Sequence, residues 1–201
     1  MSKYCGPRLR ITRRLGKLLA FTQKVSNRSS RPGQHGANNV KMTQFAYRLR
    51  EKQKLRFYYG ISEKQLVCYV TSARKAKRST GELLLQNLEI RLDNIIYRLG
   101  WASTLPEARQ LVNHGHVLVN NQRVTIPSFS CQPLQTLAID NAENIKLLVE
   151  KNLQRRSTEI PVYLSIDRRS LTSIVNQKPT RGDVGVELTE LLVIEYYSNR
   201  L

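Results

Sequence analysis

The side chains of this chain that could do chemistry are mainly the lysines and arginines of its first 80 residues. Residues 1–80 hold 20 of these cations against two carboxylates, Glu51 and Glu63, whereas residues 81–201 hold 13 groups of each sign. The whole excess charge of the chain, +18, therefore lies in its first part. Such a density of like charge repels itself unless a polyanion neutralises it, which indicates a nucleic acid or an anionic membrane as the partner.

Of these two partners, the membrane fits the sequence less well. No run approaches the roughly 18 apolar residues that cross a bilayer, and the basic segments lack a broad apolar face that could lie in an interface. Arginine, in contrast, makes planar bidentate contacts with phosphate, and nearby glycines let backbone amides approach closely. We therefore expect a nucleic-acid partner, no membrane association and no small-molecule substrate.

The sequence offers no arrangement of residues that predicts catalysis or a metal site. No Asp, His or Cys constellation suggests general acid–base or nucleophilic chemistry. Cys5, Cys68 and Cys131 are isolated, which argues against a disulfide framework and a zinc site and is typical of a reducing compartment. His114 and His116 lack further ligands at metal-binding spacing, so a helix-end position near phosphate, or simple capping, is favoured. We expect no enzyme activity, no cofactor and no metal.

The elements that must position the polar residues are clearest over 88–124. Apolar residues recur at a period near 3.6 over 88–99, which predicts an amphipathic helix ended by Gly100. Arg91 and Arg98 are seven residues apart and stand on one flank of its apolar stripe. From this pattern alone, ordinary solvated arginines would be the default interpretation.

A second helix is expected next, and a hairpin follows it. Thr104 and Glu107 predict a capping box at the start of that helix, and Arg109 and Asn113 are four residues apart on its exposed flank. Strands are expected at the end of this stretch because two asparagines, which tolerate positive φ, separate two β-prone runs. The expected segments are strands at 117–119 and 123–126 around Asn120-Asn121, then strands within 134–139, 161–166 and 184–186 and a helix at 144–154.

The first part of the chain is predicted to contain a basic arm followed by helices. Residues 1–40 are rich in Gly, Ser, Asn and Pro, so we expect a partly extended arm that is largely disordered alone and ordered by a partner. Residues 41–59 read as a helix with cations on more than one side, and we assign those cations to phosphate because few acidic partners are available. Ser62 and Gln65 predict a capping box for the next helix. The apolar run 190–198 is expected to dock on the core.

The succession RLDN, ARQLVNHGH, VLVN and IPSF over 91–129 resembles a small RNA-binding module named after a ribosomal protein. Together with GPRLRITRRLG, RPGQHG, EKQKLRFYYGIS, STGELLLQ and VIEYYS, it makes the chain similar almost end to end to small-subunit ribosomal protein four of the bacterial and organellar type. The expected fold class is α+β, with an inserted module of two helices plus a small β-sheet. The expected divisions are a basic N-terminal arm (1–40), a helical domain (41–87 plus the C-terminal part), the module (88–152) and a C-terminal segment docking back on the core (153–201).

The resemblance also implies a function. Members of the family are primary binders of 16S-type small-subunit rRNA that nucleate assembly, recognising folded RNA by shape and by phosphate neutralisation. It further implies small-subunit ribosomal proteins five and three as neighbours, mRNA nearby where it enters the subunit, and an influence on translational accuracy. The expected RNA-binding residues are Arg8, Arg10, Arg13, Arg14, Lys17, Arg31, Gln34, His35, Arg48, Lys52, Lys54, Arg56, Arg74, Lys75, Lys77, Arg91, Arg98, Arg109, Asn113, His114 and Arg123.

Two other classes of protein carry the same module and are the alternatives. An RNA-modifying enzyme of the pseudouridine synthase type appends a catalytic domain, and the segment that follows Ala142 is too short for one. A free-standing module protein of ribosome rescue lacks the basic arm and the helical domain. The motifs are nearest to plastid and cyanobacterial members, and the pattern begins at Ser2 without room for a presequence. The expected location is the plastid, with the bacterial cytoplasm as the alternative.

Overall fold

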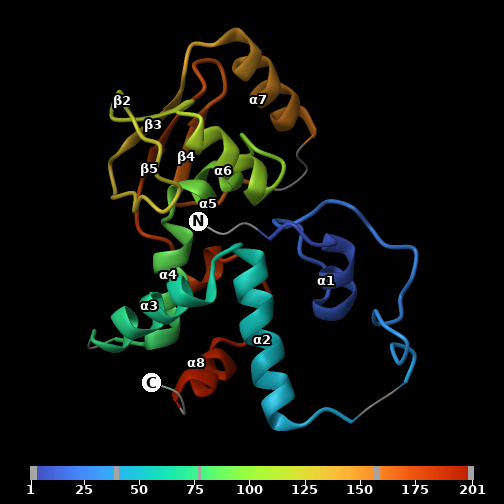
Figure 1. Cartoon of the computed structure of the whole chain (residues 1–201). Helices are drawn as coiled ribbons and strands as arrows, with labels where there is room; N and C mark the ends of the chain where they lie inside the picture. The colour runs from blue at the N-terminus through green and yellow to red at the C-terminus, as the bar shows by residue number, and fades with distance from the viewer. Residues whose placement is uncertain (1–3, 39–40, 77, 156–158, 199–201) are drawn as a thin grey trace. The chain divides into compact units, whose positions relative to one another are not determined.

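The computed structural model describes residues 4–38, 41–76, 78–155 and 159–198. This part of the chain forms an α+β fold in two compact units, labelled element by element in Figure 1. The helical unit comes from the two ends of the chain, residues 1–84 and 186–201, and the sheet unit comes from residues 85–185 between them. The α+β class predicted from the sequence is confirmed.

The helical unit is organised by α2 (Gln44–Tyr58), which buries Leu55 and Tyr58. The next helix, α3 (Glu63–Arg74), buries Leu66 and Val70. From the far end of the sequence, α8 (Glu190–Ser198) packs against α2 and α3, as Figure 1 shows in red beside cyan. The C-terminal apolar run therefore docks on the core of this unit. The helix α4 (Thr80–Glu89) then carries the chain into the sheet unit.

Side-chain caps explain where the helices α2 and α3 begin. The Thr43 hydroxyl accepts a hydrogen bond from the Ala46 amide at 3.2 Å. At α3, the Ser62 hydroxyl accepts from the Gln65 amide at 3.3 Å, and the Gln65 side-chain oxygen accepts from the Ser62 amide at 3.4 Å. These bonds satisfy amides that have no partner within the first turn. The capping box predicted at Ser62 and Gln65 is confirmed.

The N-terminal arm contains more regular structure than its composition indicated. The helix α1 (Arg8–Leu15) ends at Gly16, whose φ of 99° suits a residue without a side chain. Leu18 and Phe21 beyond it are buried, and the Phe21 ring lies 5.7 Å from that of Phe57 on α2. A few apolar residues therefore anchor this segment on α2, and the expectation that residues 1–40 are largely disordered without a partner stays a prediction.

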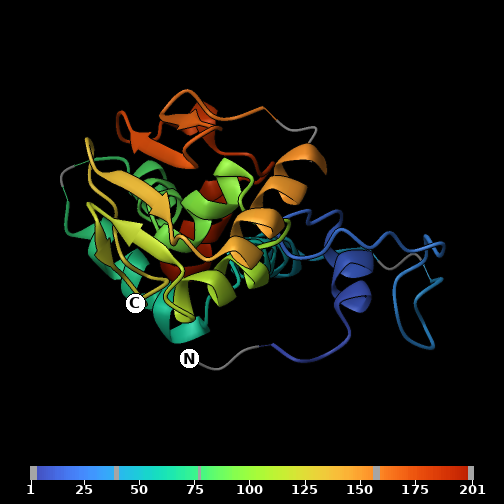
Figure 2. The same ribbon diagram turned by 90° about the horizontal axis from the view of Figure 1, so that it is seen from above.

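The sheet unit is a five-stranded antiparallel sheet in the order β2-β1-β3-β5-β4. Alternate strand residues such as Val117, Leu137 and Val175 point into the core, where they meet apolar residues of the helices α5, α6 and α7. Figure 2 views the strands and these helices from above. The bounds are α5 (Leu92–Leu99), α6 (Leu105–Asn113), β1 (Val117–Val119), β2 (Gln122–Arg123), β3 (Thr136–Ile139), α7 (Glu143–Arg155), β4 (Leu164–Asp167), β5 (Thr172–Val175) and a 3-10 turn (Arg181–Asp183).

The helix expected over 88–99 is two helices. Between α4 and α5 the backbone is extended at Arg91 (φ −66°, ψ 138°), where it forms an isolated β-bridge with Ser130. The Leu92 amide donates to the Phe129 carbonyl at 2.9 Å, so the backbone groups freed by the break are paired with another segment. The predicted end at Gly100 is confirmed, since this residue is left-handed with φ of 84°.

The cap of α6 also differs from the prediction. The Thr104 side chain makes no capping hydrogen bond, so the capping box of Thr104 and Glu107 is wrong. Instead, the Glu107 carboxylate accepts from the Ser103 amide at 2.7 Å and from the Ser103 hydroxyl. Its other oxygen accepts from the Asn152 side chain at 3.2 Å, which ties α6 to α7. The Glu107 carboxylate thus accepts hydrogen bonds from Ser103, one residue before the predicted cap at Thr104, and it also joins α6 to α7.

The hairpin and the later strands follow the sequence pattern only in part. Asn120 and Asn121 both have positive φ (49° and 65°) in the turn between β1 and β2, as predicted. The return strand is β2, which begins one residue before and ends three residues before the expected 123–126. The helix expected at 144–154 is α7, and β3 and β4 overlap the expected strands. No strand is described at 184–186, and β5 lies between the expected strands at 161–166 and 184–186, where the sequence pattern predicted none.

The structure divides the expected C-terminal segment 153–201 between the two units. Strand β5 pairs with β3 in the register Thr136↔Ile174, and β4 pairs with β5, so residues up to 185 belong to the sheet unit. Only the residues from 186 onward return to the helical unit. The sheet unit therefore extends well past the expected boundary at 152, because its sheet includes two strands from later in the chain.

Candidate nucleic-acid interface

Arg91 and Arg98, expected on an RNA-facing flank of the module, are buried at 1% and 6% exposure. The Arg91 guanidinium binds both oxygens of Asp93, at 3.1 and 3.0 Å. Arg109, which is 22% exposed, binds the same carboxylate at 2.7 Å. Asp93 therefore holds one buried and one partly exposed arginine at the start of α5.

The second buried carboxylate, Glu89, receives Arg98. Two guanidinium nitrogens of Arg98 donate to the two Glu89 oxygens at 3.0 and 2.6 Å. Asn94 and Tyr163 also donate to Glu89, at 2.6 and 3.3 Å. Burial and the neighbouring Glu89 raise the pKa of the Tyr163 hydroxyl, which keeps it a donor.

This network corrects the prediction for Arg91 and Arg98. Each lies inside the sheet unit against a buried carboxylate, so neither presents its guanidinium to a ligand at the surface. The pairing joins the end of α4 to α5 and, through Tyr163, to the segment before β4. The flank of the predicted helix that carries these two arginines is therefore buried in the tertiary structure.

The cations of α2 have more acidic partners than the sequence suggested. Lys52 is only 4% exposed, donates to both Glu63 oxygens at 2.8 and 2.9 Å, and lies over the ring of Tyr196. Arg48 binds Glu195 of α8 at 2.7 Å. The assignment of Lys52 to phosphate is therefore wrong in this structure, because a carboxylate 11 residues away and an aromatic ring of α8 enclose it.

Two further cations of α2 are also engaged. Lys54 donates to the backbone carbonyl of Glu187. Arg56 lies 3.7 Å from Glu63 and over the ring of Phe57. Burial opposes ionisation of Glu63, but hydrogen bonds from Lys52 and Tyr197 together with the nearby cations hold its pKa below the ordinary value. These contacts hold α2, α3 and the C-terminal segment together.

In the N-terminal arm, two arginines donate hydrogen bonds to backbone carbonyls of the arm itself. Arg8 donates to the Phe21 carbonyl at 3.4 Å and lies over the Phe21 ring. Arg13 donates to the carbonyls of Ser30 and Arg31 at 2.9 and 3.3 Å, which pins α1 to the loop beyond it. Both arginines were expected to bind RNA, and the structure shows them positioning the backbone of the arm.

Other predicted cations of the helical unit are available at its surface. Within the described ranges these side chains have no ion pair and no side-chain hydrogen bond to the protein. Most of them are exposed, and Arg74 is half-buried. They are Arg10, Arg14, Lys17, Arg74 and Lys75. Lys77 lies outside the described residues.

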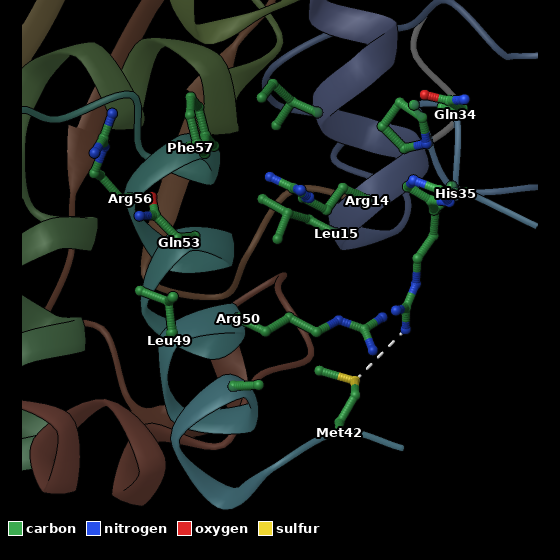
Figure 3. A pocket seen from close by; sticks show the side chains of 16 residues that line it. Arg14, Leu15, Gln34, His35, Met42, Leu49, Arg50, Gln53, Arg56 and Phe57 are labelled. Carbon is green, nitrogen blue, oxygen red and sulfur yellow. Dashed lines mark hydrogen bonds between the residues drawn. The ribbon is translucent and has the colours of Figure 1, made fainter. Parts of the chain in front are cut away.

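A pocket of about 720 Å³ in the helical unit brings several predicted residues together. Its walls are α1, the loop 31–36 and α2, and Figure 3 shows Arg50 reaching from α2 toward that loop. From the predicted set it gathers Arg14, Arg31, Gln34, His35 and Arg56. The list of expected RNA-binding residues omitted two further polar side chains of the lining, Arg50 and Gln53, although the cations of residues 41–59 as a group were assigned to phosphate. Their spacing of three on α2 places them on one face of the helix, a signal that the sequence already contained.

The sheet unit places the remaining predicted residues at its surface. Asn113 and His114 are exposed at the C-terminal end of α6. Arg123 on β2 is largely exposed and binds Asp140 at 3.1 Å. The His114 and His116 rings are 6.0 Å apart, and no group of three metal-ligating side chains occurs among the described residues. In the same part of the chain, none of the helices is long and apolar enough to cross a bilayer.

Two family models match adjoining parts of the chain. The model for the ribosomal protein S4/S9 N-terminal domain matches residues 3–89, and the model for the S4 domain matches residues 90–133. The chain is 51% identical to small ribosomal subunit protein uS4c of Oltmannsiellopsis viridis, over 98% of this chain and all of the relative. It is 52% identical to uS4 of Thermosynechococcus vestitus and to uS4c of Rhodomonas salina, over the full length of each pair.

Proposed function

Because this chain belongs to the uS4 family of small ribosomal subunit proteins, we propose that it is a structural constituent of the small subunit that binds its 16S-type rRNA. The identities of about one half over whole chains support this assignment. The proposal includes no enzymatic role, in keeping with the names of these relatives. Neither an RNA-modifying enzyme nor a free-standing rescue protein matches a chain with both family domains.

The observation that carries the proposal is the unequal distribution of charge between the two units. The helical unit holds 21 lysines and arginines and six carboxylates, whereas the sheet unit holds 12 and nine. Ion pairs occupy only some of the cations of the helical unit, and Arg10, Lys17 and Lys75 remain exposed among the described residues without such partners. Cations without carboxylate partners are the groups that release counterions on binding a phosphate backbone.

The finer parts of the role are also proposals. The protein would grip folded rRNA early and so nucleate assembly, with the helical unit supplying attraction and the sheet unit a shaped edge near Asn113 and His114. Small-subunit ribosomal proteins five and three would be its neighbours, close to the path by which mRNA enters, and it would influence translational accuracy. The uS4c names of two relatives support a plastid location, and the cyanobacterial relative keeps the bacterial cytoplasm as the alternative.

Filter binding of the full chain to a small-subunit rRNA transcript, with a large-subunit rRNA transcript as competitor, tests the proposal. We expect at least tenfold preference for the small-subunit transcript and a log K that falls linearly with log salt. The triple variant R10Q/K17Q/K75Q should bind more weakly and with a shallower salt slope. Equal affinity for both transcripts would contradict the proposal.

The matched control for this experiment is the triple variant K151Q/R155Q/K178Q. It removes the same one arginine and two lysines, all exposed, from the sheet unit. We expect it to keep most of the affinity and slope of the unchanged protein. If both triple variants lose the same affinity, binding depends on total charge and the helical unit has no special role.

A further inference from the structure

We propose that the pocket between α1, the loop 31–36 and α2 holds one unpaired nucleotide of the RNA, with its base inside and its phosphate at the rim. This inference rests on the proposed function and names the feature of the RNA that this site takes. It goes beyond attraction to a phosphate backbone, because a concave site with apolar walls and a few polar groups can receive only a base that has left its stack.

The size and the walls of the pocket fit a base. Its volume of about 720 Å³ lies in the range of small-molecule sites, which are mostly apolar with a few placed polar groups. Ile11 and Leu15 line it from α1, and Leu49 and Phe57 line it from α2. These side chains offer a flat base an apolar surface, and RNA-binding proteins commonly stack unpaired bases on aromatic side chains.

Gln53, one of the residues that line the pocket, has a side-chain oxygen that lacks a partner among the described residues. The side-chain oxygen of Gln53 is buried and accepts no hydrogen bond in the described part of the chain. Buried polar atoms are paired in the great majority of cases, so an unpaired one in a pocket indicates a group that a ligand would satisfy. An amide can pair with the donors and acceptors along the edge of a base. Gln34, on the facing loop, supplies a second amide.

The rim carries cations that are free to meet a phosphate. Arg14 and Arg50 have no ion pair or side-chain hydrogen bond within the described ranges, and no carboxylate lines the pocket. The Arg31 side chain donates a hydrogen bond to the sulfur of Met42 at 3.5 Å, which Figure 3 marks with a dashed line, and pairs with no carboxylate among the described residues. Arginine binds phosphate oxygens in a bidentate manner. Three arginines around one opening would therefore hold the phosphates that flank an inserted base.

The loop that closes the pocket depends on glycine. Gly33 has a φ of 107°, and a Cβ on Gly36 would lie 1.9 Å from the Arg31 carbonyl oxygen. The Gly36 amide donates to the Gly33 carbonyl at 3.1 Å, and Arg13 holds the Arg31 carbonyl from the α1 side. The wall is therefore a tightly folded loop with fixed backbone positions, as a site for a single nucleotide requires.

The test probes the base edges of the rRNA transcript chemically, in complex with the full chain and with its variants. Gln53→Leu removes the amide at nearly constant volume, and Gln53→Glu keeps the shape but adds a negative charge. Gln44→Leu on the exposed first turn of α2 is the control. We expect one unpaired nucleotide to be protected by the unchanged protein and by Gln44→Leu, and exposed in complexes with both Gln53 variants. Circular dichroism establishes that each variant is folded.

The role of the pocket arginines is tested by measuring the affinity of the variants for the rRNA transcript. Arg50→Gln should weaken binding at least fivefold more than Lys64→Gln, an exposed cation of the same unit outside the pocket. If Arg50→Gln weakens binding while both folded Gln53 variants protect every nucleotide as the unchanged protein does, the pocket takes a phosphate alone and the inference is wrong. If no variant changes binding or protection, the pocket is unused, which also overturns it. Failure of the unchanged protein to bind the transcript would instead refute the proposed function.

Discussion

Replacing Arg98 by methionine should destabilise the sheet unit by about 3–4 kcal/mol at pH 7. Breaking a buried ion pair by removing one partner costs about 3–5 kcal/mol, because the other charge stays buried. Two hydrogen bonds to Glu89, from Asn94 and Tyr163, would remain.

Urea denaturation followed by tryptophan fluorescence measures this stability. Trp101, the single tryptophan of the chain, is fully buried in the core of the sheet unit and reports on that unit. The control is Arg123→Met, which breaks an exposed pair with Asp140 and should cost under about 1 kcal/mol at pH 7. An Arg98→Met variant with unchanged stability and weakened RNA binding would refute the reasoning and return Arg98 to the RNA-facing set.

Three further predictions follow from the contacts described. The lowered pKa of Glu63 means that its contribution to the helical unit is present at neutral pH and is lost as the pH falls below the ordinary value of 4.5, so Glu63→Gln should flatten the acid limb of stability measured by circular dichroism. Deleting residues 1–40, with nine cations and no carboxylate, should flatten the salt dependence of rRNA binding; an unchanged slope would show that the arm is dispensable. Burial raises the pKa of Cys131 to about 12, so a thiol reagent at pH 8 should label only the two exposed cysteines until the protein unfolds, and rapid labelling of all three would contradict the packing.

Local chemistry made much of the fold predictable. The capping box at Ser62, the left-handed end at Gly100 and the turn at Asn120-Asn121 each depend on residues within a few positions of one another, and all are present. The failures involve distant segments. The helix break at Arg91 is stabilised by pairing with residues near 129, and β5 exists because β3 lies beside it. No periodicity within a short window contains that information.

The same distinction between neighbouring residues and distant segments decides which cations are free to bind phosphate. Composition alone establishes that the charge excess lies in the first 80 residues and that phosphate chemistry is the plausible use for it. Which cations remain free for that use is decided by carboxylates brought in from elsewhere: Glu89 and Asp93 enclose Arg98 and Arg91 in the core, and Glu63 encloses Lys52. The tertiary structure decides this because charge pairing depends on distance in space. It also forms the pocket of Arg14, Arg31 and Arg50, whose members lie up to 36 positions apart in the sequence.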